Sequence, residues 1–207
     1  MIEPILLNDE NVIRGLNNNL VETLCEILIF QSNNIQNIFE NREGVEGAEI
    51  AMPTYLKILI RCLTSMMRTE TTVEKLVNVN NCRALIALVK IMKYSKEEEL
   101  VANSLKIIRY SLREEPHQQR AIVEYPELIN EVIQHVFKNF VHSTFINGEM
   151  KNILGLFTRK KEYVYLIKPD SIVVLVNHPS DLVSSFPTLE QISKSYIIKN
   201  VLSTTTF

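Results

Sequence analysis

Residues 82–93 read CRALIALVKIMK, and residues 126–138 read PELINEVIQHVFK. When the two are superposed with an offset of 44, the apolar positions coincide, with Leu85 on Ile129, Leu88 on Val132, Val89 on Ile133 and Met92 on Val136. A similar short block precedes each stretch, VEKLVNV at 73–79 and QRAIVEY at 119–125. A helical unit that recurs about every forty residues is typical of a helical solenoid, in which each repeat packs on its neighbours.

The composition favours an all-α protein. The chain has 207 residues, of which 46% are hydrophobic, but only 5 are Gly and none is Trp. All-β folds and phosphate-binding enzymes use more Gly, because tight turns and close backbone approach need it. We therefore expect a right-handed α-solenoid of about four repeats, some of them degenerate, that forms a single domain over 1–207.

Hydrophobic spacing predicts the individual helices. Leu20, Leu24, Ile27 and Phe30 lie near helical spacing, and NNIQNIFE at 33–40 reads as a separate short helix after them. Further helices are predicted at 51–67, around 72–78 and at 82–93. Ser95 and Glu98 have the spacing of a capping box at the start of the following helix. The ranges 41–49 and 142–149 read as loops.

The C-terminal third follows the same pattern less clearly. SIVVLVNH at 171–178 is β-rich by propensity. Its position matches the helices at 82–93 and 126–138, so we predict a helix there. Residues 186–202 are predicted to be an amphipathic helix that caps the stack, with Leu189, Ile192, Tyr196 and Val201 covering the last repeat.

The order of these segments resembles the armadillo repeat, in which three helices recur about every 42 residues. The strongest match covers 73–140, and HEAT repeats resemble the chain nearly as well. The resemblance implies a fold that holds other proteins. The Trp and Asn that bind basic peptides in some armadillo proteins are replaced here, by Lys57 and Lys106 and by Arg61 and Tyr110. The Gly that the family places before its second helix is also replaced, by Asn81-Cys82 and Tyr125-Pro126.

These replacements define a candidate partner-binding surface. Equivalent faces of successive repeats would bring together Lys57, Arg61, Lys106, Arg109 and Tyr110. Cations beside an aromatic ring suit an acidic or phosphorylated segment of another protein. An ordinary solvated basic face is the alternative interpretation.

Motifs for chemistry are missing from the sequence. It contains no HExxH, CxxC, P-loop, dinucleotide fingerprint or nucleophile elbow. We therefore expect no catalytic residue, no cofactor and no metal site. Cys25, Cys62 and Cys82 each adjoin an apolar helical stretch, which predicts buried free thiols in a reducing compartment. Glu97, Glu98 and Glu99 are expected to stabilise a helix N-terminus.

Charge and hydropathy limit the choice of partner and location. The net charge is −2 and the pI about 6.1, which disfavours nonspecific nucleic-acid binding. No run approaches the length of a membrane span, and the first residues lack the pattern of a signal peptide, so we expect a cytoplasmic or nuclear protein. The favoured function is a non-catalytic scaffold or adaptor. A regulatory subunit of an enzyme or GTPase system, and a nucleic-acid-binding helical repeat, remain alternatives.

Overall fold

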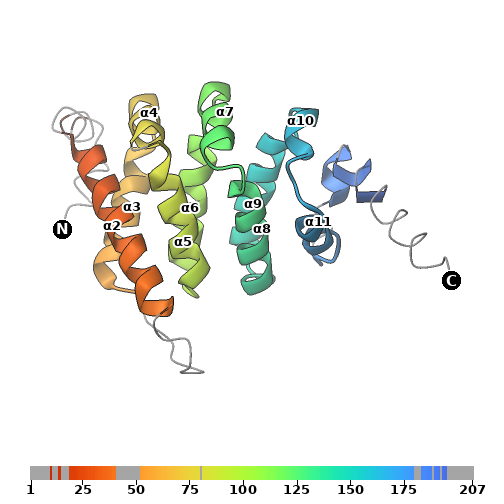
Figure 1. Cartoon of the computed structure of the whole chain (residues 1–207), viewed down its shortest axis with the longest axis horizontal. Helices are drawn as coiled ribbons and strands as arrows, with labels where there is room; N and C mark the ends of the chain where they lie inside the picture. Colours follow the sequence, from red (N-terminus) through yellow and green to blue (C-terminus); the bar gives the residue numbers. More distant parts are fainter. Residues whose placement is uncertain are drawn as a thin grey trace. The chain divides into compact units, whose positions relative to one another are not determined.

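The computed structural model describes residues 10, 14, 19–40, 52–79, 81–179, 183–187, 189–191, 193 and 194. Every regular element in these ranges is a helix, which confirms the all-α prediction (Figure 1). The elements are α2 (Leu20–Glu40), α3 (Thr54–Met66), α4 (Glu70–Asn78), α5 (Arg83–Tyr94), α6 (Glu98–Ser111), α7 (Glu115–Glu124), α8 (Leu128–Asn139), α9 (Thr144–Phe157), α10 (Lys161–Val164), α11 (Pro169–Val176) and the short 3-10 helix η2 (Val183–Ser185).

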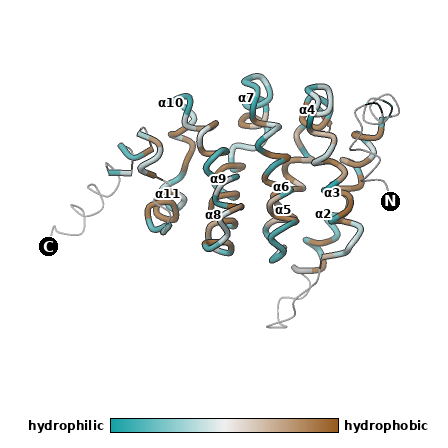
Figure 2. The backbone as a smooth tube through the Cα atoms, turned by 180° about the vertical axis from the view of Figure 1, so that it is seen from behind, coloured by the Kyte–Doolittle hydropathy of each residue, from teal (hydrophilic) through white to brown (hydrophobic). Residues whose placement is uncertain are grey.

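The chain divides into two compact units, Met1–Leu128 and Ile129–Phe207. The prediction of one repeat domain over 1–207 stays a prediction. In the first unit, each helix contacts the helix three places later: α2 contacts α5, α3 contacts α6, and α4 contacts α7. Both views place the short helices α4 and α7 at the same end of the longer helices of this unit (Figures 1 and 2). Two three-helix groups of the same order therefore pack on each other.

The core of the first unit comes from the stripes that the hydrophobic spacing predicts. Helices α3, α5 and α6 bury the apolar positions that recur at helical spacing, such as Leu56, Leu88 and Leu105. Two large apolar side chains of α3, Tyr55 and Ile58, stay exposed. The fully buried large side chains of this unit include Leu56, Ile60, Leu63, Leu76, Leu85, Leu88 and Ile91. Removing such side chains from water supplies most of the free energy that holds packed helices together.

The first helix differs from the prediction. Helix α2 is continuous over 21 residues, so NNIQNIFE is its last part and not a separate helix. Its buried face runs through Val21, Cys25, Leu28, Ser32 and Ile35, whereas the predicted Ile27 and Phe30 are exposed. The Ser32 hydroxyl donates to the Ile29 carbonyl at 2.8 Å, so a polar residue is satisfied within the buried face. The apolar pattern alone did not show this rotation of the helix.

The turn before α5 lies where the armadillo pattern has a glycine and this chain has Asn81 and Cys82. Asn81 and Cys82 have φ values of 53° and 61°, both in the left-handed region that glycine adopts without steric cost. The buried Cys82 thiol donates to the Val77 carbonyl at 3.3 Å, which holds this turn against the end of α4. The chain thus keeps the backbone conformation but not the residue that usually provides it. Before α8 there is no such conformation, since Tyr125 has φ −142°.

The second unit contains one confirmed prediction and one error. Pro169–Val176 is a helix, as position in the repeat predicted against its β propensity. The expected loop at 142–149 is wrong, because α9 begins at Thr144. The Ser143 hydroxyl caps it by accepting from the Ile146 N–H at 3.2 Å, and Ile146 is buried. Helix α8 begins at Leu128, two residues later than the predicted start at Pro126.

A buried asparagine ties together the second unit. Asn130 of α8 is 4% exposed. Its Nδ2 donates to the Leu166 carbonyl at 2.9 Å, and its Oδ1 accepts from the Lys168 N–H at 2.7 Å. These two bonds fix the segment between α10 and α11 against α8.

The remaining predicted features fall partly or wholly outside the described residues. The loop at 41–49 lies outside them, as do Ile192, Tyr196 and Val201 of the predicted capping helix. Within the capping segment, Leu189 is fully buried, and Gln191 and Lys194 are exposed, as the predicted amphipathic pattern requires.

Candidate partner-binding surface

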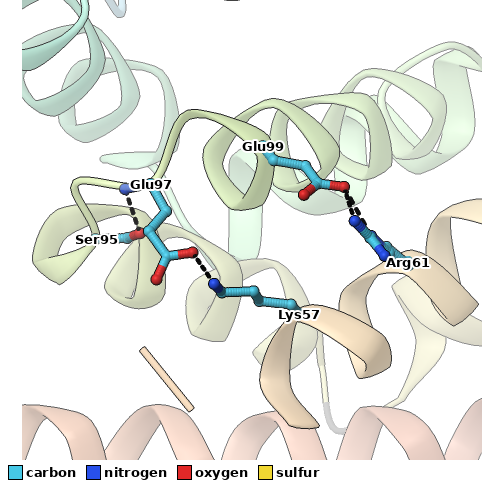
Figure 3. A network of polar contacts seen from close by, with 5 residues as sticks. All are labelled: Lys57, Arg61, Ser95, Glu97 and Glu99. Carbon is cyan, nitrogen blue, oxygen red and sulfur yellow. Dashed lines mark hydrogen bonds and ion pairs between the residues drawn. The ribbon is translucent and has the colours of Figure 1, made fainter. Parts of the chain in front are cut away.

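The predicted basic residues of α3 face the start of α6 (Figure 3). Lys57 Nζ lies 2.6 Å from Glu97 Oε2. Arg61 Nε donates to Glu99 Oε1 at 2.7 Å, and its Nη2 pairs with the same oxygen. The structure therefore brings each of these two cations to a carboxylate at the start of α6.

The glutamate run has a second role beyond the helix terminus. Helix α6 begins at Glu98 with Glu97 as its N-cap, and no side chain caps its first turn. The Ser95 hydroxyl accepts from the Glu97 N–H at 3.1 Å and not from Glu98, so the predicted capping box is wrong. Ser95 instead fixes the backbone of Glu97, whose carboxylate then reaches Lys57 (Figure 3).

The two ion pairs change the electrostatics of the predicted surface. Their side chains are 31% to 56% exposed, and pairs in such surroundings stabilise a protein by about 0–1 kcal/mol each. Their main effect is local neutralisation, because Glu97 and Glu99 already occupy the positions that an acidic ligand of Lys57 and Arg61 would take. Recognition of an acidic segment by these two residues stays a prediction.

The other predicted residues lie further along α6. The Arg109 guanidinium lies 4.6 Å from the centre of the Tyr110 ring, a cation–π contact. Lys106 and Tyr110 are half-buried. We call the polar side chains along these two helices the α3–α6 surface: Lys57, Arg61, Ser65 and Arg68 along α3 and the turn after it, and Glu99, Asn103, Lys106 and Tyr110 along α6.

A polar cleft lies on this surface between the two helices. It has a volume of about 320 Å³ and is lined by Arg61, Thr64, Ser65, Glu99 and Asn103. The Thr64 hydroxyl donates to the Ile60 carbonyl of its own helix at 2.8 Å. It also lies 3.5 Å from the Asn103 carbonyl, where α3 and α6 approach each other. The cleft thus presents hydroxyl, amide and charged groups that can hydrogen-bond a polypeptide backbone.

A second cavity lies at the C-terminal ends of the same helices. We call this space of about 350 Å³ the arginine cavity. Its lining residues are Met67, Arg68, Thr69, Glu70, Val73, Tyr110, Arg113 and Glu114. Of the predicted residues, only Tyr110 lines it.

Sequence reasoning missed Arg68 and Arg113, although the repeat contains a signal for them. Arg68 follows Met67, the C-cap of α3, and Arg113 follows Leu112, the C-cap of α6. The two arginines are 45 residues apart, and each is followed by the N-cap of the next helix, Thr69 or Glu114. An offset one residue longer than the 44 that aligns the predicted helices would have aligned these two cations.

Within the described ranges, no group of three or more His, Cys, Asp or Glu side chains could hold a metal ion. All three cysteines are buried, and none of them forms a disulfide. Burial, with smaller contributions from Glu22 and Glu26, raises the pKa of the Cys25 thiol to about 12. Burial also raises the pKa of the Cys82 thiol to about 11, so neither is a thiolate at neutral pH.

None of the described helices combines the length and apolar character needed to cross a bilayer. Comparison with known proteins finds no matching family model, no matching curated protein and no matching solved structure. The armadillo-like class therefore enters below as a proposal.

Proposed function

We propose that this chain is a non-catalytic scaffold or adaptor: an armadillo-like α-solenoid that holds a segment of a partner protein on its α3–α6 surface. The observation that carries this proposal is the pairing of every helix of the first unit with the helix three places later, α2 with α5, α3 with α6 and α4 with α7. Such pairing is what stacked three-helix repeats of about forty residues require.

Repeats stacked in this way present equivalent helix faces side by side. Helices α3 and α6 occupy equivalent places in the two three-helix groups and contact each other, so their outward faces form one extended surface. Solenoids commonly use such surfaces to bind elongated partners. The polar cleft lies between α3 and α6, and the arginine cavity lies at the C-terminal ends of the same helices. Together the two spaces offer room for an extended chain.

The side chains of this surface suit a polypeptide. Arg61 and Glu99 border the cleft as a partly exposed pair, and Ser65 and Asn103 add a hydroxyl and an amide. A side-chain amide both donates and accepts, as a peptide bond does, so it can match an extended backbone. Tyr110 adds an aromatic side chain of the kind that is enriched at protein interfaces.

Site-directed photo-cross-linking tests the proposal. A photoreactive amino acid is placed at Asn103 in the polar cleft or, as the matched control, at Lys93 on the exposed side of α5. We expect a discrete protein adduct from position 103 in cells and none from position 93. Equal adducts from both positions, or adducts that ribonuclease removes, would contradict a protein-binding role for this surface.

A further inference from the structure

The arginine cavity carries an inference that rests on the proposed function and deepens it. Arg68 and Arg113 come from corresponding turns of two successive three-helix groups and line the same cavity. Neither lies inside a helix, and both are exposed. Two guanidinium groups that line one space can both donate to a single anion, and Glu70 and Glu114 line the same space. We propose that this cavity binds a phosphorylated side chain of the partner segment.

The arginines of this cavity are less neutralised than the cations near the polar cleft. Lys57 and Arg61 hold carboxylates at close range, as described above. In contrast, Arg68 makes no ion pair with any residue that the structure describes. Arg113 has only a loose contact, with its Nε 3.8 Å from Glu114 Oε1 and its side chain 70% exposed. An incoming anion therefore meets less internal competition here than at Lys57 and Arg61.

The two glutamates that line the cavity determine which kind of anion can bind there. Glu70 and Glu114 also line the cavity and balance the charge of the two arginines. A single carboxylate would compete with them on equal terms. A phosphate monoester carries a charge of about −1.5 to −2 and three acceptor oxygens. It can take a charge-assisted bond from each guanidinium at once, which favours the phosphorylated side chain.

The remaining lining fits such a group in size and polarity. The volume of about 350 Å³ lies within the range of small-ligand pockets. Tyr110 brings a phenolic hydroxyl, and the Arg109 guanidinium on its ring adds positive charge nearby.

Nuclear magnetic resonance titration with three defined probes tests this inference. The probes are the capped tripeptide Ala-phosphoserine-Ala, its Ala-Asp-Ala counterpart and inorganic phosphate. We expect the phosphopeptide to shift the side-chain Nε–H resonances of Arg68 and Arg113 and to bind at least about threefold more tightly than the aspartyl peptide. Shifts confined to Lys57 and Arg61, no shifts at all, or equal binding of the aspartyl peptide would overturn the assignment. Inorganic phosphate that binds as tightly as the phosphopeptide would show a free-anion site and overturn the partner-segment assignment.

Paired variants make the result independent of folding defects. Arg68→Gln with Arg113→Gln should weaken phosphopeptide binding by about tenfold or more. Glu70→Gln with Glu114→Gln should strengthen it, because the competing carboxylates are gone. Arg83→Gln with Lys93→Gln, which removes two exposed cations of α5 outside the α3–α6 surface, is the matched control and should leave it unchanged. A loss of binding in the control, or no change in either of the first two pairs, would contradict the proposal.

The outcomes also separate this inference from the proposed function. A cross-link from position 103 without phosphopeptide binding at Arg68 and Arg113 would support the scaffold function and refute the phosphate-binding inference. Phosphopeptide binding without a cross-link specific to position 103 would refute the proposed scaffold function, on which the inference rests.

Discussion

Replacement of Asn130 by alanine tests how the second unit is held together. Asn130 is almost fully buried, and it bonds the Leu166 carbonyl at 2.9 Å and the Lys168 N–H at 2.7 Å. Alanine would leave both backbone groups without these partners. A buried polar group that loses its partner costs about 1–3 kcal/mol. Allowing for partial access of water, we expect Asn130→Ala to lower the free energy of unfolding by about 2–4 kcal/mol.

Asn139→Ala is the matched control for this change. Asn139 lies in the same helix and also donates to a backbone carbonyl, that of His135 at 2.9 Å, but it is exposed. Its replacement should change the free energy of unfolding by less than about 0.5 kcal/mol, because water replaces the lost bond.

Two measurements check the prediction. Urea denaturation followed by circular dichroism gives the change in unfolding free energy for both variants. Hydrogen exchange of the Lys168 amide reports the local bond directly and should accelerate at least about tenfold in Asn130→Ala. If Asn130→Ala matched Asn139→Ala in stability and left the Lys168 amide protected, the asparagine would not hold the segment between α10 and α11.

Three further predictions follow from single residues. Burial lowers the pKa of His178, which packs on Phe137 with ring centres 4.4 Å apart. The unfolded chain therefore binds a proton at this histidine near pH 6.5, whereas the folded chain binds it only at lower pH, so the free energy of unfolding should fall as the pH drops from 7 to 5. His178→Gln should reduce this fall when the free energy of unfolding is measured by urea titration at several pH values. The same pH dependence in His178→Gln and the unmodified protein would refute the prediction. Asn81→Gly should raise the free energy of unfolding by up to about 1 kcal/mol, whereas Asn81→Val should lower the thermal midpoint, since φ at this position is 53°. Cys25 and Cys82 should resist iodoacetamide at pH 8 in the native protein and react in urea, as mass spectrometry can show; fast native alkylation would contradict their raised pKa values.

Repetition made much of the fold predictable. The SIVVLVNH segment has the composition of a strand, but its place in the repeat correctly indicated the helix Pro169–Val176. Packing against neighbours outweighs local propensity in such a segment, and only the repeat pattern contains that information. The buried faces of α3, α5 and α6 were predictable for the same reason.

The errors occurred where a contact beyond the local sequence decides the outcome. Ile27 and Phe30 have helical spacing, yet α2 buries Leu28 and Ser32 in a unit where it packs on α3, α4 and α5. The start of α9 was missed because Gly148 and the polar residues around it outweighed the cap that Ser143 provides. In both cases the local sequence pattern was compatible with more than one structure, a different buried face for α2 and a loop in place of the start of α9.

The packing of α3 beside α6 was predictable from the repeat, but the charge of the surface between them was not. Lys57 and Arg61 do lie on α3 facing α6, yet the glutamates that neutralise them were assigned to the helix terminus alone. The missing criterion is an opposite charge at about one repeat spacing. Lys57 and Glu97 are 40 residues apart, and Arg61 and Glu99 are 38 apart.

Pairing of each helix with the third one after it also determines when contacts can form during translation. The pairs α2–α5, α3–α6 and α4–α7 all lie within the first 124 residues. No part of them waits for the remainder of the chain to leave the ribosome. As α5 emerges, it finds α2 already synthesised, and α6 and α7 then meet α3 and α4 in the order in which they are made. During synthesis from the N-terminus, each later helix thus meets an earlier helix that it can pack on at once. This shortens the time for which the apolar faces of α2 and α3 stay exposed.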